Sequence, residues 1–328
     1  MGAPEVSIIM PVFNAGAGGA YLRDAVRSLL RQRPLPGMAL PSMEILLVDD
    51  NSDELATLGA LAVLADWPQV VILHNRRAKG PAGARNTGLH AARGNWVAFL
   101  DADDLWLPYA LAQRWQVAAT HAGAKWVAGG FSLLRARADG SFADFEELTS
   151  EAAASPGITA AGPAPAAPGA VRHLRRPVAL LAAECIVIPT TVLMRRDLLL
   201  AKGGFDERLR RAEDYHLWLR CALDTDLWLL PTPVAHYRIH GASLTHGDAP
   251  RFLHEDRMLA LLLGHAAWLP HRPLLIARYD LVMQDHCWFY RGRRRQRAAL
   301  RCALQWVARR PLHGAAWWEL LASALRRG

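Results

Sequence analysis

Residues 45–50 read Ile-Leu-Leu-Val-Asp-Asp, and residues 96–103 read Trp-Val-Ala-Phe-Leu-Asp-Ala-Asp. Each stretch is a short, mainly aliphatic run that ends in carboxylates, which is typical of a buried parallel strand. The carboxylates that end the two runs are Asp49, Asp50, Asp101 and Asp103. Like charges at one edge of a sheet repel one another unless water or a positive group lies between them, and a divalent metal is the natural candidate.

Strand and helix patterns alternate through the first third of the chain. Strands are predicted at 6–10, 44–48, 70–73 and 96–100, and helices at 21–31, about 54–65 and about 82–92. This alternation predicts an α/β fold with a mainly parallel, Rossmann-like sheet and helices on both faces. Ligands of such sheets bind beyond the carboxyl ends of the strands, where the aspartates lie.

The second half of the chain divides into three parts. Residues 150–170 are rich in Ala, Gly and Pro, so a flexible loop is predicted there. Further strands are predicted at 186–188, 191–194, 227–230 and 234–239, and a helix at 215–223. Beyond His246 the pattern is helical, and residues 247–328 are expected to form a helical C-terminal extension.

Charge favours anionic partners. The 328 residues include 38 Lys and Arg against 30 Asp and Glu, a formal net charge of +8. Phosphates and anionic lipid surfaces both suit this charge. The basic residues form no recognition helix, zinc-binding spacing or aromatic ribonucleoprotein pattern, so no nucleic-acid partner is expected.

Cysteine usage and targeting signals indicate a compartment. The four cysteines are dispersed and form no CxxC pair, which fits a reducing cytosol. The N-terminus shows no secretory or myristoylation signal. The apolar stretch 258–269 is interrupted by His265 and is shorter than the roughly 20 residues of a spanning helix. We expect a cytoplasmic protein, with peripheral contact at the inner face of the membrane as a further expectation.

Several motifs together resemble family 2 glycosyltransferases with the GT-A fold. The nucleotide-sugar half matches at residues 7–14 (SIIMPVFN), 48–53 (VDDNSD), 80–86 (GPAGARN) and 99–104 (FLDADD). The acceptor half matches at residues 203–207 (GGFDE), 213–214 (ED) and 237–243 (YRIHGAS). The resemblance implies a GT-A domain over residues 1–246, with a nucleotide-sugar half at 1–110 and an acceptor half at 178–246.

The resemblance implies metal-dependent, inverting sugar transfer. The donor would be a nucleoside diphosphate sugar, with UDP favoured, and the acceptor a hydroxyl of a glycan or lipid-linked glycan, in cell-surface polysaccharide or lipopolysaccharide assembly. Asp101 and Asp103 would hold Mn²⁺ or Mg²⁺, because hard carboxylate oxygens suit these ions and residues i and i+2 of an extended segment face one side. His240 would be a third ligand or would contact the diphosphate.

The resemblance also assigns a nucleotide site. Asp49 would accept a hydrogen bond from the base N3–H, which disfavours a cytosine donor. Backbone around Pro11 and Val12 would lie against the base, and Asn14 ends the same segment. Arg85 would meet phosphate or base through charge-assisted hydrogen bonds, or would pair with an aspartate in a structural network.

For catalysis the resemblance implies one general base. Asp214 would take the proton of the acceptor hydroxyl; the alternative is a helix cap. Glu213 and Trp218 are weaker candidates for contact with the acceptor or sugar, and Trp218 is alternatively a core residue. Asp50 would orient a nearby loop or cap the following helix, and Asp104 is expected to cap the helix near Pro108.

The C-terminal region interleaves basic residues with Trp306, Trp317 and Trp318. This pattern indicates contact with an anionic membrane, a helical cap on the catalytic domain, or oligomerisation.

Two rival functions are weighed against sugar transfer. A sugar-phosphate nucleotidyltransferase should carry a Gly-rich loop with Arg and Lys after its first strand, whereas this chain has Pro-Val-Phe-Asn at 11–14. A non-catalytic nucleotide-sugar-binding scaffold would have no need of intact acids at positions 101, 103 and 214.

Overall fold

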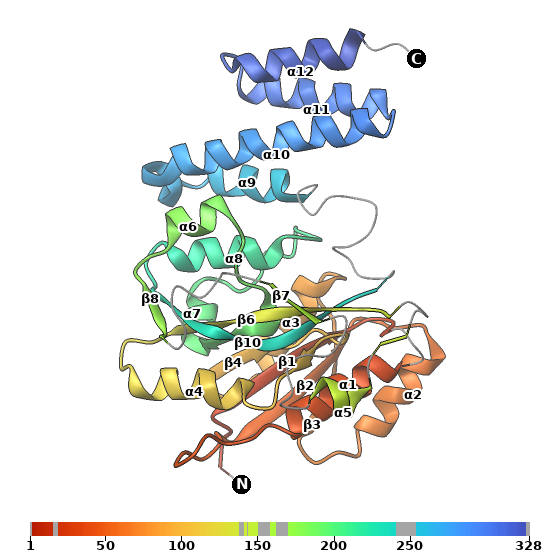
Figure 1. The fold of residues 1–328 in the computed structure, drawn as a ribbon, viewed down its shortest axis with the longest axis vertical. Coiled ribbons are helices and arrows are strands. Elements are labelled where there is room, and N and C mark those ends of the chain that lie inside the picture. The colour runs from red at the N-terminus through yellow and green to blue at the C-terminus, as the bar shows by residue number, and fades with distance from the viewer. Residues whose placement is uncertain are drawn as a thin grey trace. The chain divides into compact units, whose positions relative to one another are not determined.

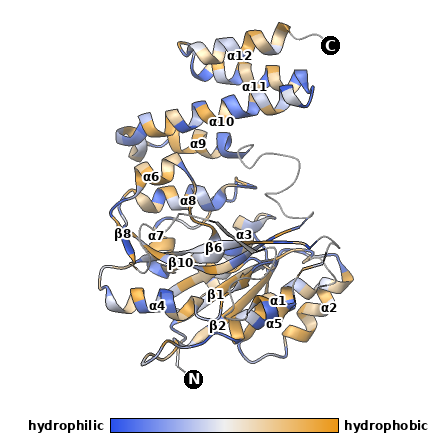
Figure 2. Cartoon of the chain, in the orientation of Figure 1, coloured by the Kyte–Doolittle hydropathy of each residue, from blue (hydrophilic) through white to orange (hydrophobic). Residues whose placement is uncertain are grey.

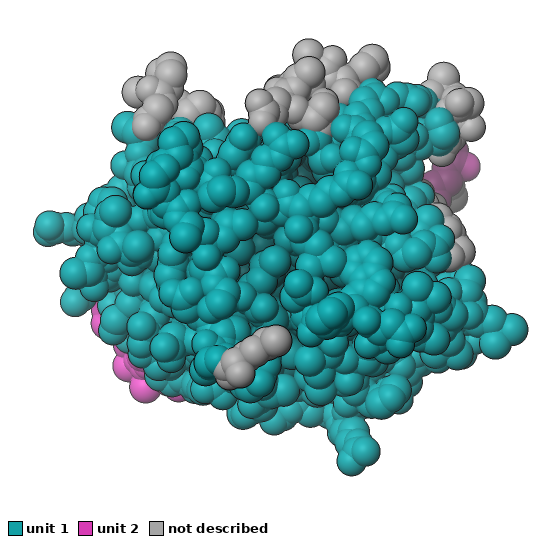
Figure 3. All heavy atoms as spheres, turned by 90° about the horizontal axis from the view of Figure 1, so that it is seen from below, with its two compact units in different colours: residues 1–243 teal, residues 244–328 magenta. Residues whose placement is uncertain are grey.

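The computed structural model describes residues 2–15, 19–137, 141–142, 144–149, 158–161, 170–240 and 254–325. The chain forms two compact units, residues 1–243 and 244–328 (Figure 3). Unit 1 contains a central sheet with helices packed on it, and the described part of unit 2 is helical (Figure 1).

One sheet runs through unit 1 in the order β3-β2-β1-β4-β9-β6-β10-β5. Its strands are β1 (Val6–Val12), β2 (Met43–Asp49), β3 (Val70–His74), β4 (Trp96–Phe99), β5 (Leu105–Trp106), β6 (Trp126–Arg135), β9 (Val192–Arg195) and β10 (Leu227–Ile239). Off this path, β7 (Ile158–Ala161) pairs with β6 and β8 (Arg172–Leu174) pairs with β10. The β3-β2-β1-β4 portion is parallel, whereas β9 runs antiparallel to both β4 and β6. The α/β class is therefore confirmed, but the sheet is mixed beyond β4.

Helices cover both faces of this sheet. Those of unit 1 are α1 (Ala20–Leu30), α2 (Leu55–Leu64), α3 (Pro81–Ala91), α4 (Ala110–Thr120), α5 (Phe145–Leu148), α6 (Val178–Ala183), α7 (Arg196–Ala201) and α8 (Glu213–Ala222), with a short 3-10 turn η2 (Pro189–Thr191). Helix α3 packs on β1 and β2, α4 packs on β6 and β10, and α1 contacts α2 and β5.

Successive side chains of β1 point to opposite faces of the sheet, as the two-residue period of a strand requires, so they pack against the helices on both faces. Ile8 and Met10 join a core with residues of α1 and α2. Ile9 faces α3, where a Cβ on Gly88 would lie 2.4 Å from Ile9 Cγ2. Glycine at position 88 therefore allows α3 to approach the sheet closely. Figure 2 shows the resulting apolar strands at the centre of the unit.

The strands and helices predicted over residues 6–100 are confirmed within a few residues. Further along the chain the structure differs from the prediction at several places. Strand β6 was not predicted, residues 186–188 are irregular although Val187 is buried, and 227–230 and 234–239 form one bulged strand, β10. Of the predicted loop at 150–170, residues 158–161 form β7, while 150–157 and 162–169 lie outside the described residues.

Unit 2 begins its described part with α9 (Glu255–Leu263) and the 3-10 segment η4 (Ala266–His271). The helices that follow are α10 (Arg272–Gly292), α11 (Gln296–Arg309) and α12 (Gly314–Leu325). Helix α11 packs on both α10 and α12. Within the described residues, a helix with the length and apolar character needed to cross a membrane is not found.

Candidate functional site

The carboxyl ends of β1, β2 and β4 open at one edge of the sheet. Strand β1 lies between the other two and pairs in parallel with each, and Val12 is in register with Asp49. Asp101 and Asp103 follow directly after β4, so the parallel order brings both acidic clusters to the same edge.

Arg85 on α3 joins this edge to α8. Its Nη2 donates to Asp101 Oδ1 at 2.7 Å, and its Nη1 donates to Glu213 Oε1 at 2.6 Å. The guanidinium is 4% exposed and also lies over the Phe205 ring, 5.4 Å from the centroid. Burial acts to lower the pKa of Arg85, but the charges of Asp101 and Glu213 outweigh it and raise the pKa above its ordinary value.

Helix α8 begins with the acidic pair. Ala212, just before it, has φ 58°, a left-handed conformation that turns the chain into the helix. Burial, reinforced by the neighbouring Asp214 carboxylate, raises the pKa of Glu213 to about 7 against the opposing charge of Arg85. Burial also raises the pKa of Asp214 above its ordinary value, although Arg85 and the Tyr215 N–H oppose the change. Asp214 as a whole residue is partly exposed, and its Oδ1 accepts from the Tyr215 N–H at 2.8 Å.

A second contact across the edge joins Asp103 to His240, at the end of β10. Asp103 Oδ2 lies 2.9 Å from His240 Nε2, and the two side chains are 33% and 17% exposed. Asp101, by contrast, forms an ion pair with Arg85. In the described part of the chain, no group of three or more His, Cys, Asp or Glu side chains is arranged to hold a metal ion. A carboxylate and an imidazole that converge and are partly exposed are chemically suited to a divalent ion, but they supply only part of the ligands that such an ion needs.

Asp49 and Asp50, at the end of β2, make hydrogen bonds with different parts of the chain. Asp49 is 4% exposed and accepts from the Ser52 N–H at 3.0 Å. Asp50 accepts from Asn75 Nδ2 at 2.5 Å and from the Gly80 N–H at 2.8 Å. Of the two interpretations left open for Asp50, the structure shows the one in which it orients a loop, the loop that leads into α3.

The remaining residues of the predicted nucleotide site lie at the end of β1. Val12 is fully buried and Pro11 partly exposed. Asn14 has φ 44° and accepts from the N–H groups of Asp53 and Glu54, both at 3.1 Å. Asn14 therefore holds the loop after β2 against the end of β1.

Two side chains given no role in the sequence analysis, Asn86 and Glu207, join the halves of unit 1. Asn86 exchanges hydrogen bonds with the backbone of Phe205, both at 2.9 Å, and donates to Glu207 Oε1 at 2.8 Å. Both residues lie inside the quoted motifs. Their pairing could not be predicted because it spans 121 residues of sequence.

The structure decides for the core alternative at Trp218, against contact with the sugar, and it contradicts the prediction for Asp104. Trp218 has no exposed surface and packs on Trp126 and Phe205, so a sugar ring cannot stack on it. Asp104 caps no helix: it is 1% exposed and binds the Thr190 hydroxyl at 2.6 Å and the Arg238 N–H at 3.0 Å, while Tyr109 precedes α4 without a side-chain cap. Residues 241–243 of the last motif lie outside the described residues.

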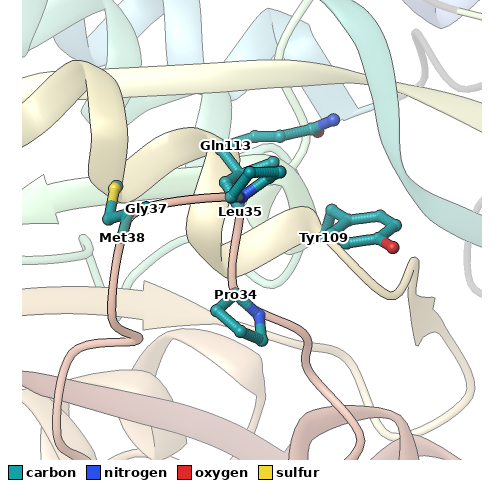
Figure 4. Close-up of a pocket in the computed structure, with 7 residues that line it drawn as sticks. Pro34, Leu35, Gly37, Met38, Tyr109 and Gln113 are labelled. Atoms are coloured by element: carbon teal, nitrogen blue, oxygen red, sulfur yellow. The ribbon is translucent and has the colours of Figure 1, made fainter.

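A pocket of about 550 Å³ opens elsewhere on unit 1, between the α1–β2 connection and the start of α4 (Figure 4). It is lined by Pro34, Leu35, Pro36, Gly37, Met38, Tyr109 and Gln113. The lining contains no acid, base or nucleophile of the acidic cluster, so this pocket is separate from the candidate site.

Comparisons with known proteins agree with this geometry. Residues 7–127 match the family described as Glycosyl transferase family 2. The chain is 31% identical over 267 residues to the succinoglycan biosynthesis protein ExoO of Rhizobium meliloti, covering 81% of this chain and 68% of that protein. It is 37% identical over 102 residues to the Escherichia coli protein named UDP-Glc:alpha-D-GlcNAc-diphosphoundecaprenol beta-1,3-glucosyltransferase WfgD, covering 31% of this chain and 36% of that protein.

Solved structures share the fold. Staphylococcus aureus TarS 1–349 in complex with UDP-GlcNAc superposes with a TM-score of 0.62 at 16% identity, covering 97% of this chain and 89% of that one. The Pyrobaculum calidifontis mannosyltransferase PcManGT, in complex with GDP-Man and Mn²⁺, gives 0.57 at 17% identity, covering 99% and 85%. The sheet order, the acidic edge and the similarity to ExoO over most of both chains establish that this chain belongs to the family 2 glycosyltransferases.

Proposed function

We propose that this glycosyltransferase is metal-dependent and inverting, and that it moves a sugar from a nucleoside diphosphate, UDP being favoured, to a hydroxyl of a glycan or lipid-linked glycan. The names of ExoO and WfgD refer to a polysaccharide and to a diphosphoundecaprenol-linked acceptor, which supports a role in cell-surface polysaccharide assembly. The chain spans only about a third of WfgD, so the acceptor is part of the proposal.

One observation carries this proposal. The Arg85 guanidinium holds Asp101, from the donor half, and Glu213, from the acceptor half, at 2.7 and 2.6 Å. Asp214, the second residue of α8, therefore lies beside the edge that carries the sequence-predicted donor residues. A transferase that displaces a diphosphate with an alcohol needs a base close to the donor, and this position of Asp214 supports its assignment as that base.

In the proposed reaction Asp214 accepts the proton of the acceptor hydroxyl. The hydroxyl oxygen forms a bond to the anomeric carbon as the bond to the diphosphate oxygen breaks, so configuration inverts in one displacement. The pKa of Asp214 is raised by burial, and this makes Asp214 a stronger base than an exposed aspartate. Arg85 keeps the first turn of α8 in place through Glu213.

Asp103 and His240, with Asp101 nearby, are the residues that would hold Mn²⁺ or Mg²⁺. When bound, such an ion neutralises charge on the departing diphosphate. Asp49 with the backbone at Pro11 and Val12 would receive the base, and Asn14 would fix the loop that closes this side.

Two rivals are weaker. Family membership and the Pro-Val-Phe-Asn sequence after β1 argue against a sugar-phosphate nucleotidyltransferase. The intact acids Asp103 and Asp214, which lie on the two sides of the same edge, argue against a non-catalytic scaffold. We place the reaction in the cytoplasm, because all four cysteines are free thiols, with peripheral contact at the inner membrane face.

A panel of nucleotide sugars, each with and without Mn²⁺, tests the proposal by thermal stabilisation, because a ligand selective for the folded state raises the Tm. We expect the largest Mn²⁺-dependent rise with a UDP-sugar, followed by UDP release when acceptor extract is added. Stabilisation by a CDP-sugar in place of the UDP-sugars would refute the role of Asp49. Stabilisation without any transfer would favour the scaffold.

A further inference from the structure

Helix α12 in unit 2 has an inverted distribution of polarity. A helix on a globular protein ordinarily buries its apolar stripe and exposes its polar one. In α12 the exposed side chains are apolar: Trp317 (47%), Trp318 (68%), Leu321 (54%) and Leu325 (78%), together with Ala324. These five residues, the α12 apolar face, fall on one side of the helix because they are spaced by one, four, seven and eight positions.

Two of the three buried residues of the same helix are polar, and the third is the small Ala316. Glu319 is 2% exposed, accepts from Trp288 Nε1 at 2.9 Å and pairs with Arg291 of α10. Ser323 is 1% exposed. Because these contacts fix which side of α12 faces α10 and α11, the exposure of the apolar face is built into unit 2.

The charge of the chain is concentrated in unit 2. Residues 244–328 contain 14 Lys and Arg against 6 Asp and Glu, a difference of +8. Residues 1–243 contain 24 of each, so they carry no net formal charge. The whole formal charge of +8 therefore belongs to the unit that exposes the α12 apolar face.

Part of this charge lies beside α12. The exposed residues Arg293, Arg294 and Arg295 connect α10 to α11, and the exposed Arg297 follows in the first turn of α11; these four residues are called the arginine turn. Gln296, the first residue of α11, donates to the carbonyl oxygen of Ser323 in the last turns of α12. The arginine turn is thus adjacent to the C-terminal end of the apolar face.

From this arrangement we propose that the α12 apolar face and the arginine turn dock unit 2 on an anionic lipid surface. Tryptophan and leucine side chains enter the boundary between headgroups and acyl chains, and arginines beside them attract anionic headgroups. A helix of 12 residues is too short to span the bilayer, so α12 would lie in this boundary.

A second copy of the chain fits the α12 apolar face less well than a lipid surface, because it would bring together two units that each carry a formal charge of +8. The proposal rests on unit 2 and is independent of which sugar is transferred.

Vesicle flotation of the full chain tests the proposal, with phosphatidylcholine vesicles with and without phosphatidylglycerol. We expect binding to the anionic vesicles that weakens with salt. The combined change Trp317→Gln, Trp318→Gln and Leu321→Gln should lower the partition coefficient about tenfold or more. Arg294→Gln with Arg297→Gln should lower it about tenfold and flatten the salt dependence.

A matched control lies on α2, where Leu55 (84%) and Val63 (57%) are exposed apolar residues of unit 1, which has no net formal charge. Leu55→Gln with Val63→Gln should leave flotation unchanged. Circular dichroism melts would verify that each variant folds, and transfer to a soluble acceptor should persist in all of them. Equal binding to neutral vesicles, unchanged flotation of the α12 variant, or an oligomer that dissociates in that variant without any vesicle binding would each overturn the proposal.

Discussion

The Arg85 guanidinium and the Glu213 carboxylate lie 2.6 Å apart although 128 residues separate them in sequence. Both groups are almost fully buried, at 4% and 7% exposure. A buried ion pair is costly to break, because removing one partner leaves an uncompensated charge. The contact therefore fixes α8 against α3 and, through Asp101, against the end of β4.

Replacing Arg85 with lysine keeps the charge but loses the fork that reaches two carboxylates at once. We expect Arg85→Lys to lower kcat/KM about a hundredfold, because the acidic groups lose their fixed spacing. Steady-state UDP release measures this. Arg93→Lys is the control, since Arg93 is 65% exposed and pairs with Glu44 away from the cluster. Equal activity of the two variants would contradict the positioning role of Arg85.

Changing Asp214 to asparagine removes the proposed base while keeping the side-chain shape. We expect kcat to fall by roughly 10²–10⁴, the usual contribution of a general base, with the Kd for UDP almost unchanged. Turnover assays and calorimetric titration with UDP measure the two effects. Asp224→Asn, at an exposed residue that pairs with Lys202 beyond the end of α8, should be silent. Full transfer by Asp214→Asn would refute the assignment.

The raised pKa of Glu213 predicts a pH dependence of stability with a definite sign. Between its ordinary value of 4.5 and about 7, the folded state binds the proton more tightly than the unfolded state. Stability contributed by this group therefore falls as pH rises through that window. We expect the Tm of Glu213→Gln relative to wild type to increase by a few degrees from pH 5 to pH 8, as roughly 2–4 °C corresponds to about 1 kcal/mol in a domain of this size.

Glu207→Gln serves as the control for this pH series. The pKa of Glu207 is lowered: burial opposes the change, but hydrogen bonds from Asn86, Ala78 and Arg77 outweigh it. Its stabilising contribution is lost only as pH falls below about 4.5, so the Tm difference from wild type should be constant from pH 5 to pH 8. A Glu213→Gln difference that is also constant would contradict the raised pKa.

His240→Ala tests the metal site by a readout other than activity. With UDP present, we expect the Mn²⁺ concentration that gives half-maximal thermal stabilisation to rise about tenfold, because one ligand beside Asp103 is lost. His90→Ala, at an exposed histidine in the last turn of α3, should leave this midpoint unchanged. An unaltered midpoint for His240→Ala would remove that residue from the site.

Two glycine substitutions test the packing that supports the site. Gly204 has φ 65°, and a Cβ there would lie 2.5 Å from Asn86 Oδ1. Gly204→Ala should destabilise the protein by about 1–3 kcal/mol, because both backbone strain and crowding of Asn86 follow. Gly59→Ala, in α2 with open space around the added carbon, should stabilise it by about 0.4–1 kcal/mol. Chemical denaturation measures both, and equal effects would contradict the argument.

Local patterns in the sequence were sufficient for the parallel half of the sheet. Strands such as β2 and β4 are mainly apolar runs with aspartates at or just after their ends, and this information lies within a few neighbouring residues. Strand β6 was not predicted, because Gly129 and Gly130 interrupt its apolar run and only pairing with β9 and β10 decides its conformation. The single strand β10 was divided in two for a similar reason, since Pro231 and Pro233 interrupt its pattern where the strand is bulged.

The sequence by itself determined the family, the fold class and the acidic residues at the strand ends, because these are written in short motifs whose order survives in one dimension. Only the tertiary structure decided that Asp104 and Trp218 are buried, that Arg85 connects the two halves, and that α12 exposes its apolar side. The burial and pairing of a residue depend on which distant parts of the chain the fold places next to it. A pattern of neighbouring residues in the sequence does not contain this information.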